Sequence, residues 1–373
     1  MHKAWIGTIV TAALLALLLT GCGDQRVLEK LGFIHTVSYD LIEKEEGPED
    51  DDLQVTIRLR KSDPYTDQVK NETISVSAHT VKQAKIKQNQ QSEGKLVSGQ
   101  IRNVLFGISM ARKGIWPIIN TVLRDPYLSP RVKVTVVDGD AHSLTNKEYP
   151  QHLPTGQYIV RLLEKEAKSH TVPRTTLHEF VRDYHDDGVD PIAPIIKESD
   201  NHIAVTGIAL FQDDVYKGRL NATEAMVFAF LKSSFSRGGL NLVVSSGDMQ
   251  SITSDYSKSR RTVQVTRGID GHSYHVSIFV KAVTSITEYT GEKSTVIEND
   301  RIERELAARL TKQGAEVIHK LQQSQVDSLG IGKYVRNSMT YSEWSALDWR
   351  SVYPTVQIDC KFKVTIKDYG RLQ

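Results

Sequence analysis

Cys22 is the residue whose neighbours most directly indicate a chemical modification. The segment Ala4–Gly23 around it carries no charge, is rich in leucine, and follows a short polar start at His2 and Lys3. It ends in Leu19-Thr20-Gly21-Cys22, so small residues stand directly before the cysteine. A short apolar stretch that ends in small residues is typical of a secretory signal. We therefore expect residues 24–373 to be exported.

The chemistry that this order favours is lipidation of the Cys22 thiol. The four residues resemble a bacterial lipobox, in which the cysteine receives a diacylglyceryl group and becomes the new N-terminus. Two acyl chains give a stable anchor, because each buried methylene contributes about 0.8 kcal/mol. Two alternatives stay open, an uncleaved helix of about 20 apolar residues that spans the bilayer and an ordinary signal followed by a chance cysteine. We predict a signal peptide at residues 1–21.

The composition is that of a soluble globular protein. The 373 residues are 39% hydrophobic and 25% charged, and the length predicts two or three domains. Loss of Lys3 with the signal lowers the net charge from +2 to +1. Nucleic-acid binding requires a concentrated basic surface, so we expect no nucleic acid as a partner. The chain has two cysteines, and because Cys22 is assigned to lipid, we expect no internal disulfide.

Other motifs give no catalytic constellation. The chain lacks the GK[ST] of a phosphate-binding loop, and Gly330-Ile331-Gly332 follows a predicted helix instead of a strand. The sequence Gly107-Ile108-Ser109-Met110-Ala111 loosely resembles a nucleophile elbow, but it falls inside a predicted helix. We therefore predict no enzyme activity, no cofactor and no catalytic residue.

Two histidine clusters have residue types that bind metals. His178 and His185 are seven residues apart, so on a helix they face the same way, as a metal site requires. Asp183, His185, Asp187 and Gly188 imitate the start of a calcium loop, but the twelfth loop position is Pro194, which has no carboxylate. His272 and His275 have an odd spacing that places them on opposite faces of a strand. We interpret these clusters as a polar helix end and as turn residues, and we predict no metal site.

Three further features have a structural and a functional interpretation. Cys360 lies in register with apolar residues of a strand, which favours a buried side chain over a reactive thiol. The segment 254–267 is basic, which suits either a solvated hairpin or contact with acidic headgroups. Aromatic residues near the C-terminus favour packing of a short helix over an exposed partner site. The basic residues of the segment 254–267 are Lys258, Arg260, Arg261 and Arg267, and the aromatic residues are Tyr341, Trp344, Trp349 and Tyr353.

The elements that position these residues alternate between strands and helices. Periodicity predicts strands at 33–41, 53–60, 72–78 and 132–136, and helices at 80–91, 94–113, 158–168 and 175–184. The helix at 94–113 is expected from the spacing of Ile101, Leu105, Ile108 and Ala111, with a stop at Gly114. The acidic run 43–52 is expected to be a solvated loop.

The second half begins after Pro191, Pro194 and the polar Ser199–Asn201. We expect strands at 203–211, 215–220, 240–246, 262–266 and 274–285, with a helix at 222–231 that Asn221 and Glu224 cap. A long helix at 298–326 is followed by a strongly alternating strand at 356–366 with a basic outer side.

Several stretches together resemble the Ger(x)C family of germinant-receptor lipoproteins from endospore-forming bacteria. No single motif is specific, but their order and spacing span nearly the whole mature chain. One departure is Gly23 before Asp24, where many members have tryptophan. The matching residues are Cys22, Tyr39-Asp40, Gly107, Ala111, Gly114, Leu123-Arg124-Asp125, the sequence VKVTVVDGDA at 132–141, Gly207, Ala209, Phe211, Gly218, Leu220, Glu224, Asp327, Gly332, Trp349 and Gly370.

This resemblance implies an elongated α+β, or mixed α/β, lipoprotein of several lobes, with mixed sheets flanked by helices. The boundary near residue 198 predicts a domain at 22–198 and a second at 199–373, and the resemblance suggests that the first divides again into two lobes. The resemblance further implies a place on the outer face of the spore inner membrane, assembly with integral membrane A- and B-type receptor subunits, and no catalytic residues. The alternative function is a solute-binding lipoprotein of a transporter, which needs a cleft between two similar lobes, whereas the halves show no internal repeat.

Overall fold

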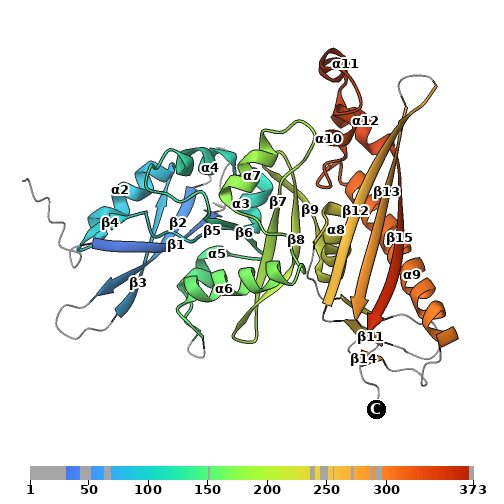
Figure 1. Cartoon of the computed structure of the whole chain (residues 1–373). Helices are drawn as coiled ribbons and strands as arrows, with labels where there is room; N and C mark the ends of the chain where they lie inside the picture. The colour runs from blue at the N-terminus through green and yellow to red at the C-terminus, as the bar shows by residue number, and fades with distance from the viewer. Residues whose placement is uncertain are drawn as a thin grey trace, which may run out of the picture.

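The computed structural model describes residues 31–42, 52–62, 69–149, 152–235, 240–243, 251–254, 256–269, 273–285, 288–289 and 296–368. Cys22, the residues 43–51 of the acidic run, His272 and Gly370 lie outside these ranges. Figure 1 shows an elongated body with a large sheet at one end and a smaller sheet at the other.

The large sheet contains nine strands among the described residues, in the order β3-β2-β1-β5-β6-β7-β8-β9, with β4 also paired to β1. Strands β1, β5, β6 and β7 run parallel, whereas β2, β3, β8 and β9 are joined antiparallel. The sheet is therefore mixed, as predicted. Its strands are β1 Leu31–Ile42, β2 Asp52–Ser62, β3 Val69–Ala78, β4 Lys95–Val97, β5 Asn103–Gly107, β6 Lys133–Val137, β7 Ile192–Ser199, β8 His202–Gln212 and β9 Val215–Asn221.

Helices cover both faces of this sheet. Phe106 packs with one group of helices, and its neighbour Leu105 packs with the other, because successive strand residues point to opposite faces. The first group is α2 Val81–Gln91, α3 Ile108–Lys113, α4 Trp116–Leu123 and α7 Leu177–Tyr184, and the second is α5 Ala141–Asn146 and α6 Thr155–Lys168. The large sheet is thus the middle of three layers.

The helix expected at 94–113 is wrong. The segment forms β4, the central strand β5 and only then α3. All five residues of β5 are buried, because parallel neighbours flank the strand and helices cover both faces. A fully buried strand is a continuous apolar run, and in this segment Ile101, Leu105 and Ile108 also happen to match the helical period.

The C-terminal part contains two three-stranded sheets among the residues described. The sheet β12-β13-β15 packs against two helices, α8 and α9, which share one apolar cluster with it. The strands are β10 Leu240–Val243, β11 Ser251–Ser254, β12 Tyr256–Arg267, β13 Tyr274–Ser285, β14 Glu288–Tyr289 and β15 Gln357–Asp368. The helices are α8 Ala222–Lys232, α9 Val296–Gln323, α10 Ile331–Arg336, α11 Tyr341–Ala346 and α12 Trp349–Val352, with a 3₁₀ turn at Tyr353–Thr355.

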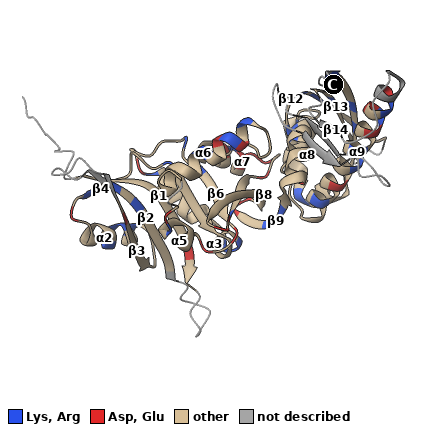
Figure 2. Ribbon diagram, turned by 90° about the horizontal axis from the view of Figure 1, so that it is seen from below, with Lys and Arg blue, Asp and Glu red and all other residues tan. Residues whose placement is uncertain are grey.

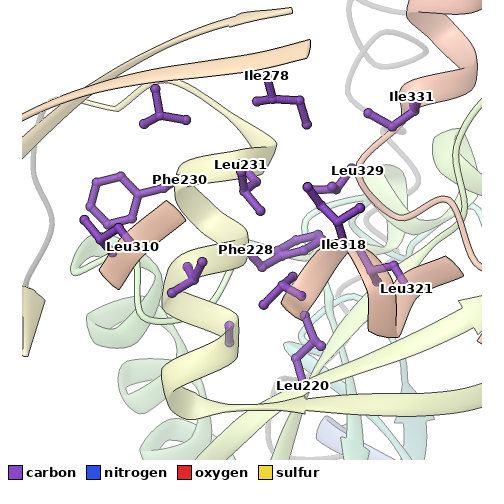
Figure 3. Packing of buried hydrophobic residues seen from close by; sticks show 14 of the residues in the cluster. Leu220, Phe228, Phe230, Leu231, Ile278, Leu310, Ile318, Leu321, Leu329 and Ile331 are labelled. Carbon is purple, nitrogen blue, oxygen red and sulfur yellow. The ribbon is translucent and has the colours of Figure 1, made fainter. Parts of the chain in front are cut away.

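Helix α8 lies between the two parts and is buried on all sides. Every residue from Ala225 to Leu231 is buried, and the predicted capping box of Asn221 and Glu224 is present. Its apolar cluster includes Leu220 of β9, Leu310 of α9 and Ile278 of β13 (Figure 3). A helix that is apolar all round must be enclosed, so α8 joins the large sheet and the C-terminal sheet in one core.

Helix α9 agrees with the predicted long helix. Acidic and basic residues are interspersed along it (Figure 2). Arg301 and Glu305 form an ion pair at 2.8 Å, and Arg304 Nε donates a hydrogen bond to the Asp300 carbonyl at 3.0 Å. Gly314 is required because a Cβ there would lie 2.7 Å from Cys360 Sγ. Close packing against β15 thus explains a glycine inside a helix, where it costs about 1 kcal/mol.

The fold class is confirmed as α+β with mixed sheets and flanking helices. Strands β8 and β9 follow residue 198 but continue the large sheet, since every residue of β7 is paired with β8 or lies at the register shift between them, and β8 is paired with β9. The division into domains 22–198 and 199–373, and a further division of the first, stay predictions about folding units.

Phe228→Ala tests whether both parts share one core. Phe228 is fully buried in the cluster around α8, and removal of such a side chain costs about 3–5 kcal/mol of unfolding free energy. Urea denaturation should show this loss in probes of both parts. Ile86→Ala is the matched control, because Ile86 is 61% exposed and exposed substitutions change stability by about 0.5 kcal/mol or less. A transition that shifts only for probes of the C-terminal part would contradict the shared core.

Candidate functional site

Three of the residues quoted for the family resemblance, Asp327, Gly332 and Trp349, meet at the junction of the two parts. The Asp327 carboxylate is buried between α9 and α10. It accepts hydrogen bonds from the backbone N–H of Ile331 at 2.8 Å, from that of Gly332 at 2.6 Å, and from Trp349 Nε1 at 3.1 Å. A carboxylate with several N–H donors is a strong connection in a dry site, so Asp327 fixes α10 and α12 relative to the end of α9.

Asp190 connects this cluster to the large sheet. It lies just before β7, and its carboxylate accepts the backbone N–H of Asp327 at 2.6 Å. The backbone N–H of Asp190 donates in return to the Asp327 carbonyl at 3.0 Å. Two chain segments far apart in sequence are therefore joined by reciprocal bonds.

Two glycines allow the segments to approach this closely. Lys333 N donates to the Gly188 carbonyl at 3.2 Å. A Cβ on Gly188 would lie 2.6 Å from Lys333 N, and one on Gly332 would lie 2.6 Å from Trp349 Nε1. The small residues are thus a packing requirement of the junction.

The acidic segment considered as a metal site contributes to the same junction. Asp186 pairs with Lys333 and Arg336, each at 3.0 Å, and the buried Asp183 pairs with Arg182 at 2.7 Å. Arg182 thus neutralises Asp183, one of the residues that imitate a calcium loop, and Lys333 and Arg336 neutralise the adjacent acid Asp186. Within the described ranges, no group of three or more His, Cys, Asp or Glu side chains is arranged to hold a metal ion.

The two junction carboxyls have altered proton affinities. Burial raises the pKa of Asp327 to about 7, although its N–H donors act in the opposite direction, and the neighbouring Asp190 adds to the rise. Burial likewise raises the pKa of Asp190 to about 6. Desolvation disfavours the charged form, which is the cause in both cases. A cleft of about 390 Å³ beside them is lined by Trp349, Arg350 and Asp213 among others.

A second carboxylate connects the motifs of the first half. Asp40, at the end of β1, accepts the backbone N–H groups of Ala141 and His142, each at 2.8 Å. A Cβ on Gly107 would lie 2.1 Å from Asp40 Oδ1. Glycine is therefore needed at the end of β5, so that Asp40 can hold the start of α5. Burial raises the pKa of Asp40 to about 7.

The segment that resembles a nucleophile elbow lies at a strand-to-helix turn, contrary to the helical context expected. Gly107 ends β5 and Ser109 belongs to the first turn of α3. In the part of the chain that the structure describes, no hydrogen bond joins Ser109 to a histidine or a carboxylate. The geometry supplies no base for this hydroxyl, which nucleophilic catalysis requires.

The remaining candidates are distributed over the C-terminal part. The Cys360 thiol donates to the Thr311 carbonyl, and burial raises its pKa to about 11, which disfavours the reactive thiolate. His275 pairs with Asp359 at 2.7 Å. His178 is exposed, whereas His185 contacts Trp116 edge to face.

The C-terminal aromatic residues pack as favoured by the sequence. Trp344, Trp349 and Tyr353 are buried and adjacent, while Tyr341 is 85% exposed. Sequence reasoning did not identify Asp190 or Gly188 as junction residues. Their only signal was a polar, glycine-containing stretch before a strand, and such stretches are also typical of ordinary loops.

Gly188→Ala tests the close approach at the junction. The added Cβ would meet backbone atoms of Gly332 and Lys333, and overpacking against backbone costs about 1–3 kcal/mol of unfolding free energy. Gly99→Ala is the matched control, because its Cβ would lie 3.6 Å from the nearest atom. Equal urea midpoints for the two variants would contradict the assignment.

Asp327→Asn tests the raised pKa. The folded state retains a proton that the unfolded chain loses above about pH 4, so the unfolding free energy of the wild type falls as the pH rises toward about 7. We expect the variant to show a flatter pH dependence over this window in urea titrations. Asp348→Asn is the control. Hydrogen bonds from Ser351 lower the pKa of Asp348, so this carboxyl group titrates below the range of pH 4 to 7. Identical slopes for wild type and Asp327→Asn would refute the assignment.

Comparison with known proteins agrees with the resemblance. The spore germination protein N-terminal domain matches residues 24–198, and the spore germination B3/GerAC-like C-terminal domain matches residues 206–370. Spore germination protein GerQC of Bacillus cereus is 23% identical, over 97% of this chain and 96% of its own length. Putative spore germination protein YfkR of Bacillus subtilis (strain 168) is 22% identical, over 99% and 98%.

A solved structure shows the same fold. The crystal structure of the GerBC protein matches with a TM-score of 0.56 and 15% identity, covering 88% of this chain and 97% of that one. The two family models together include both the large sheet and the junction around Asp327. The chain belongs to the Ger(x)C family of spore germination proteins.

Proposed function

We propose that the chain acts as the non-enzymatic C-type subunit of a spore nutrient germinant receptor. The observation that carries this proposal is the match of two consecutive germination-protein domains along residues 24–198 and 206–370. The subunit works with integral membrane A- and B-type subunits and serves as a scaffold whose sheets and helices offer binding surfaces.

Attachment to the membrane is the second part of the proposal. Cys22 carries the diacylglyceryl group on the outer face of the spore inner membrane, which the sequence Leu19-Thr20-Gly21-Cys22 supports. Strand β1 begins at Leu31, nine residues further along the chain. Nine extended residues reach about 30 Å at most, so the large sheet remains close to the bilayer. No helix of the described residues is both long and apolar enough to cross a membrane.

The absence of enzyme activity is supported by how the buried acids are used. Asp327, Asp190 and Asp40 each accept backbone N–H groups that hold two segments together. A carboxyl group that accepts these backbone hydrogen bonds joins two segments of the chain and is not directed at a substrate. A solute-binding function would need two similar lobes, and the large mixed sheet and the β12-β13-β15 sheet differ in strand number and order.

Cys22→Ala tests the anchor. The variant cannot form the thioether, so we expect it to leave the membrane fraction of spores and nutrient-triggered germination to be lost, once other germinant receptors are deleted. Cys360→Ser is the matched control, because a hydroxyl can replace the thiol donor to Thr311. Membrane retention of Cys22→Ala together with normal germination would contradict the anchor.

The partners are identified by crosslinking in spore membranes followed by affinity capture of this chain. We expect integral membrane receptor subunits among the captured proteins. Normal nutrient response after deletion of the chain, in a strain without other receptors, would contradict the receptor function itself.

A further inference from the structure

The sheet β12-β13-β15 has one covered face and one open face. Val276, Ile278 and Val280 of β13 point into the core with α8 and α9, so the residues between them point outward. The outward residue Phe279 pairs with Thr262 of β12 and with Lys361 of β15. Residues paired across strands share a face, so the three strands define the open face together.

The open face is strongly basic. We define the basic face as the six exposed cations on it, which come from all three strands. Among the described residues, none of the six forms an ion pair, and Asp359, which lies on this face, is paired with His275. The six residues are Lys258, Arg260, Lys281, Lys361, Lys363 and Lys367.

The register places like charges directly opposite one another. Arg260 pairs with Lys281, and Lys281 pairs with Lys363. Side chains opposite each other on neighbouring strands lie about 5 Å apart, and like charges in that position are destabilising. Three adjacent cations in one row therefore favour the approach of an anion.

This arrangement differs from the basic patch expected at 254–267. Arg261 turns to the covered side and donates to Tyr334, and Arg267 pairs with Glu343 at 2.7 Å. Only Lys258 and Arg260 of that patch point outward. Most of the remaining cations of the basic face come from the basic side of β15. They lie on the same surface as those of β12, because β13 lies between the two strands.

We propose that the basic face docks onto anionic lipid headgroups. Clusters of four to eight Lys or Arg residues next to a bilayer recognise such headgroups, and the face offers six from three adjacent strands. Phe279 is 40% exposed and lies beside the central row, which places an aromatic ring where it can enter the interface. Neighbouring strands give a broad and shallow surface, which suits a layer of headgroups better than a single phosphate.

The position of the basic face gives the docking a geometric consequence. The face lies at the opposite end of the elongated body from β1 (Figure 1). With the lipid anchor proposed at Cys22, the two attachments hold the long axis along the membrane. This orientation rests on the proposed function, whereas headgroup binding does not.

The test uses the full chain reconstituted in vesicles. One set contains phosphatidylglycerol and phosphatidylcholine, and the other contains phosphatidylcholine alone. Amine acetylation followed by mass spectrometry reports each lysine. We expect the modification of Lys281, Lys361 and Lys363 to slow by about fivefold or more on anionic vesicles, the effect of about one headgroup contact. Lys82 on α2 is exposed and serves as the internal control, with equal rates on both.

A charge-removal variant checks the same surface. Lys281→Gln with Lys363→Gln should restore the rate at Lys361 to that on neutral vesicles, and 0.5 M salt should do the same in the wild type. Lys82→Gln with Lys168→Gln removes as many charges elsewhere and should leave the protection intact. The first variant should melt at or above the wild-type temperature, because it relieves the repulsion of the central row.

The outcomes separate lipid from protein as the occupant. Equal lysine rates on both vesicle types would overturn the proposal. Protection that appears only on addition of an acidic polypeptide, with polyglutamate as the probe, would also overturn it and assign the face to a protein partner. Neither result depends on germination, so failure here is distinguishable from failure of the receptor function.

Discussion

The burial of α8 is the constraint on which the rest of the structure depends. A helix that is apolar around its whole circumference is stable only when other elements enclose it. Strands β8 and β9 supply one wall and β13 with α9 supply another. The two matched domain regions therefore share a core across their boundary, and relative movement of the two parts would expose Phe228 and Phe230 to water. Burying a side chain of this size contributes about 1.5–3 kcal/mol, so the core favours one fixed arrangement of the two sheets over a hinge.

The junction reinforces this arrangement with buried carboxylates. Asp327 and Asp190 replace the water that the backbone N–H groups would otherwise bind, and an unsatisfied N–H in such a place is costly. Asp40 does the same where α5 begins. Asp327 with Gly332 and Asp40 with Gly107 thus share one structural arrangement, in which a carboxylate joins two chain segments and a glycine leaves room for the close approach. Residues of this kind specify the architecture.

The sequence predicted those elements whose patterns depend on local chemistry. The alternation in β15, the long apolar stripe of α9 and the capping box of α8 each follow from residues close in the chain. Strand β5 was missed because its surroundings, and not its own periodicity, make it a strand. Asp190 was missed because its partner Asp327 lies far along the chain. Both halves of the basic face were visible as charged stretches, but their union required the order β12-β13-β15, and strand order is a tertiary property.

The basic face and the proposed anchor also differ in how they hold the membrane. Two acyl chains form a stable anchor, whereas headgroup contacts are individually weak and screened within about 8 Å at physiological salt. Once the lipid confines the chain to the surface, the second contact becomes intramolecular, and a weak face is then sufficient to orient the body.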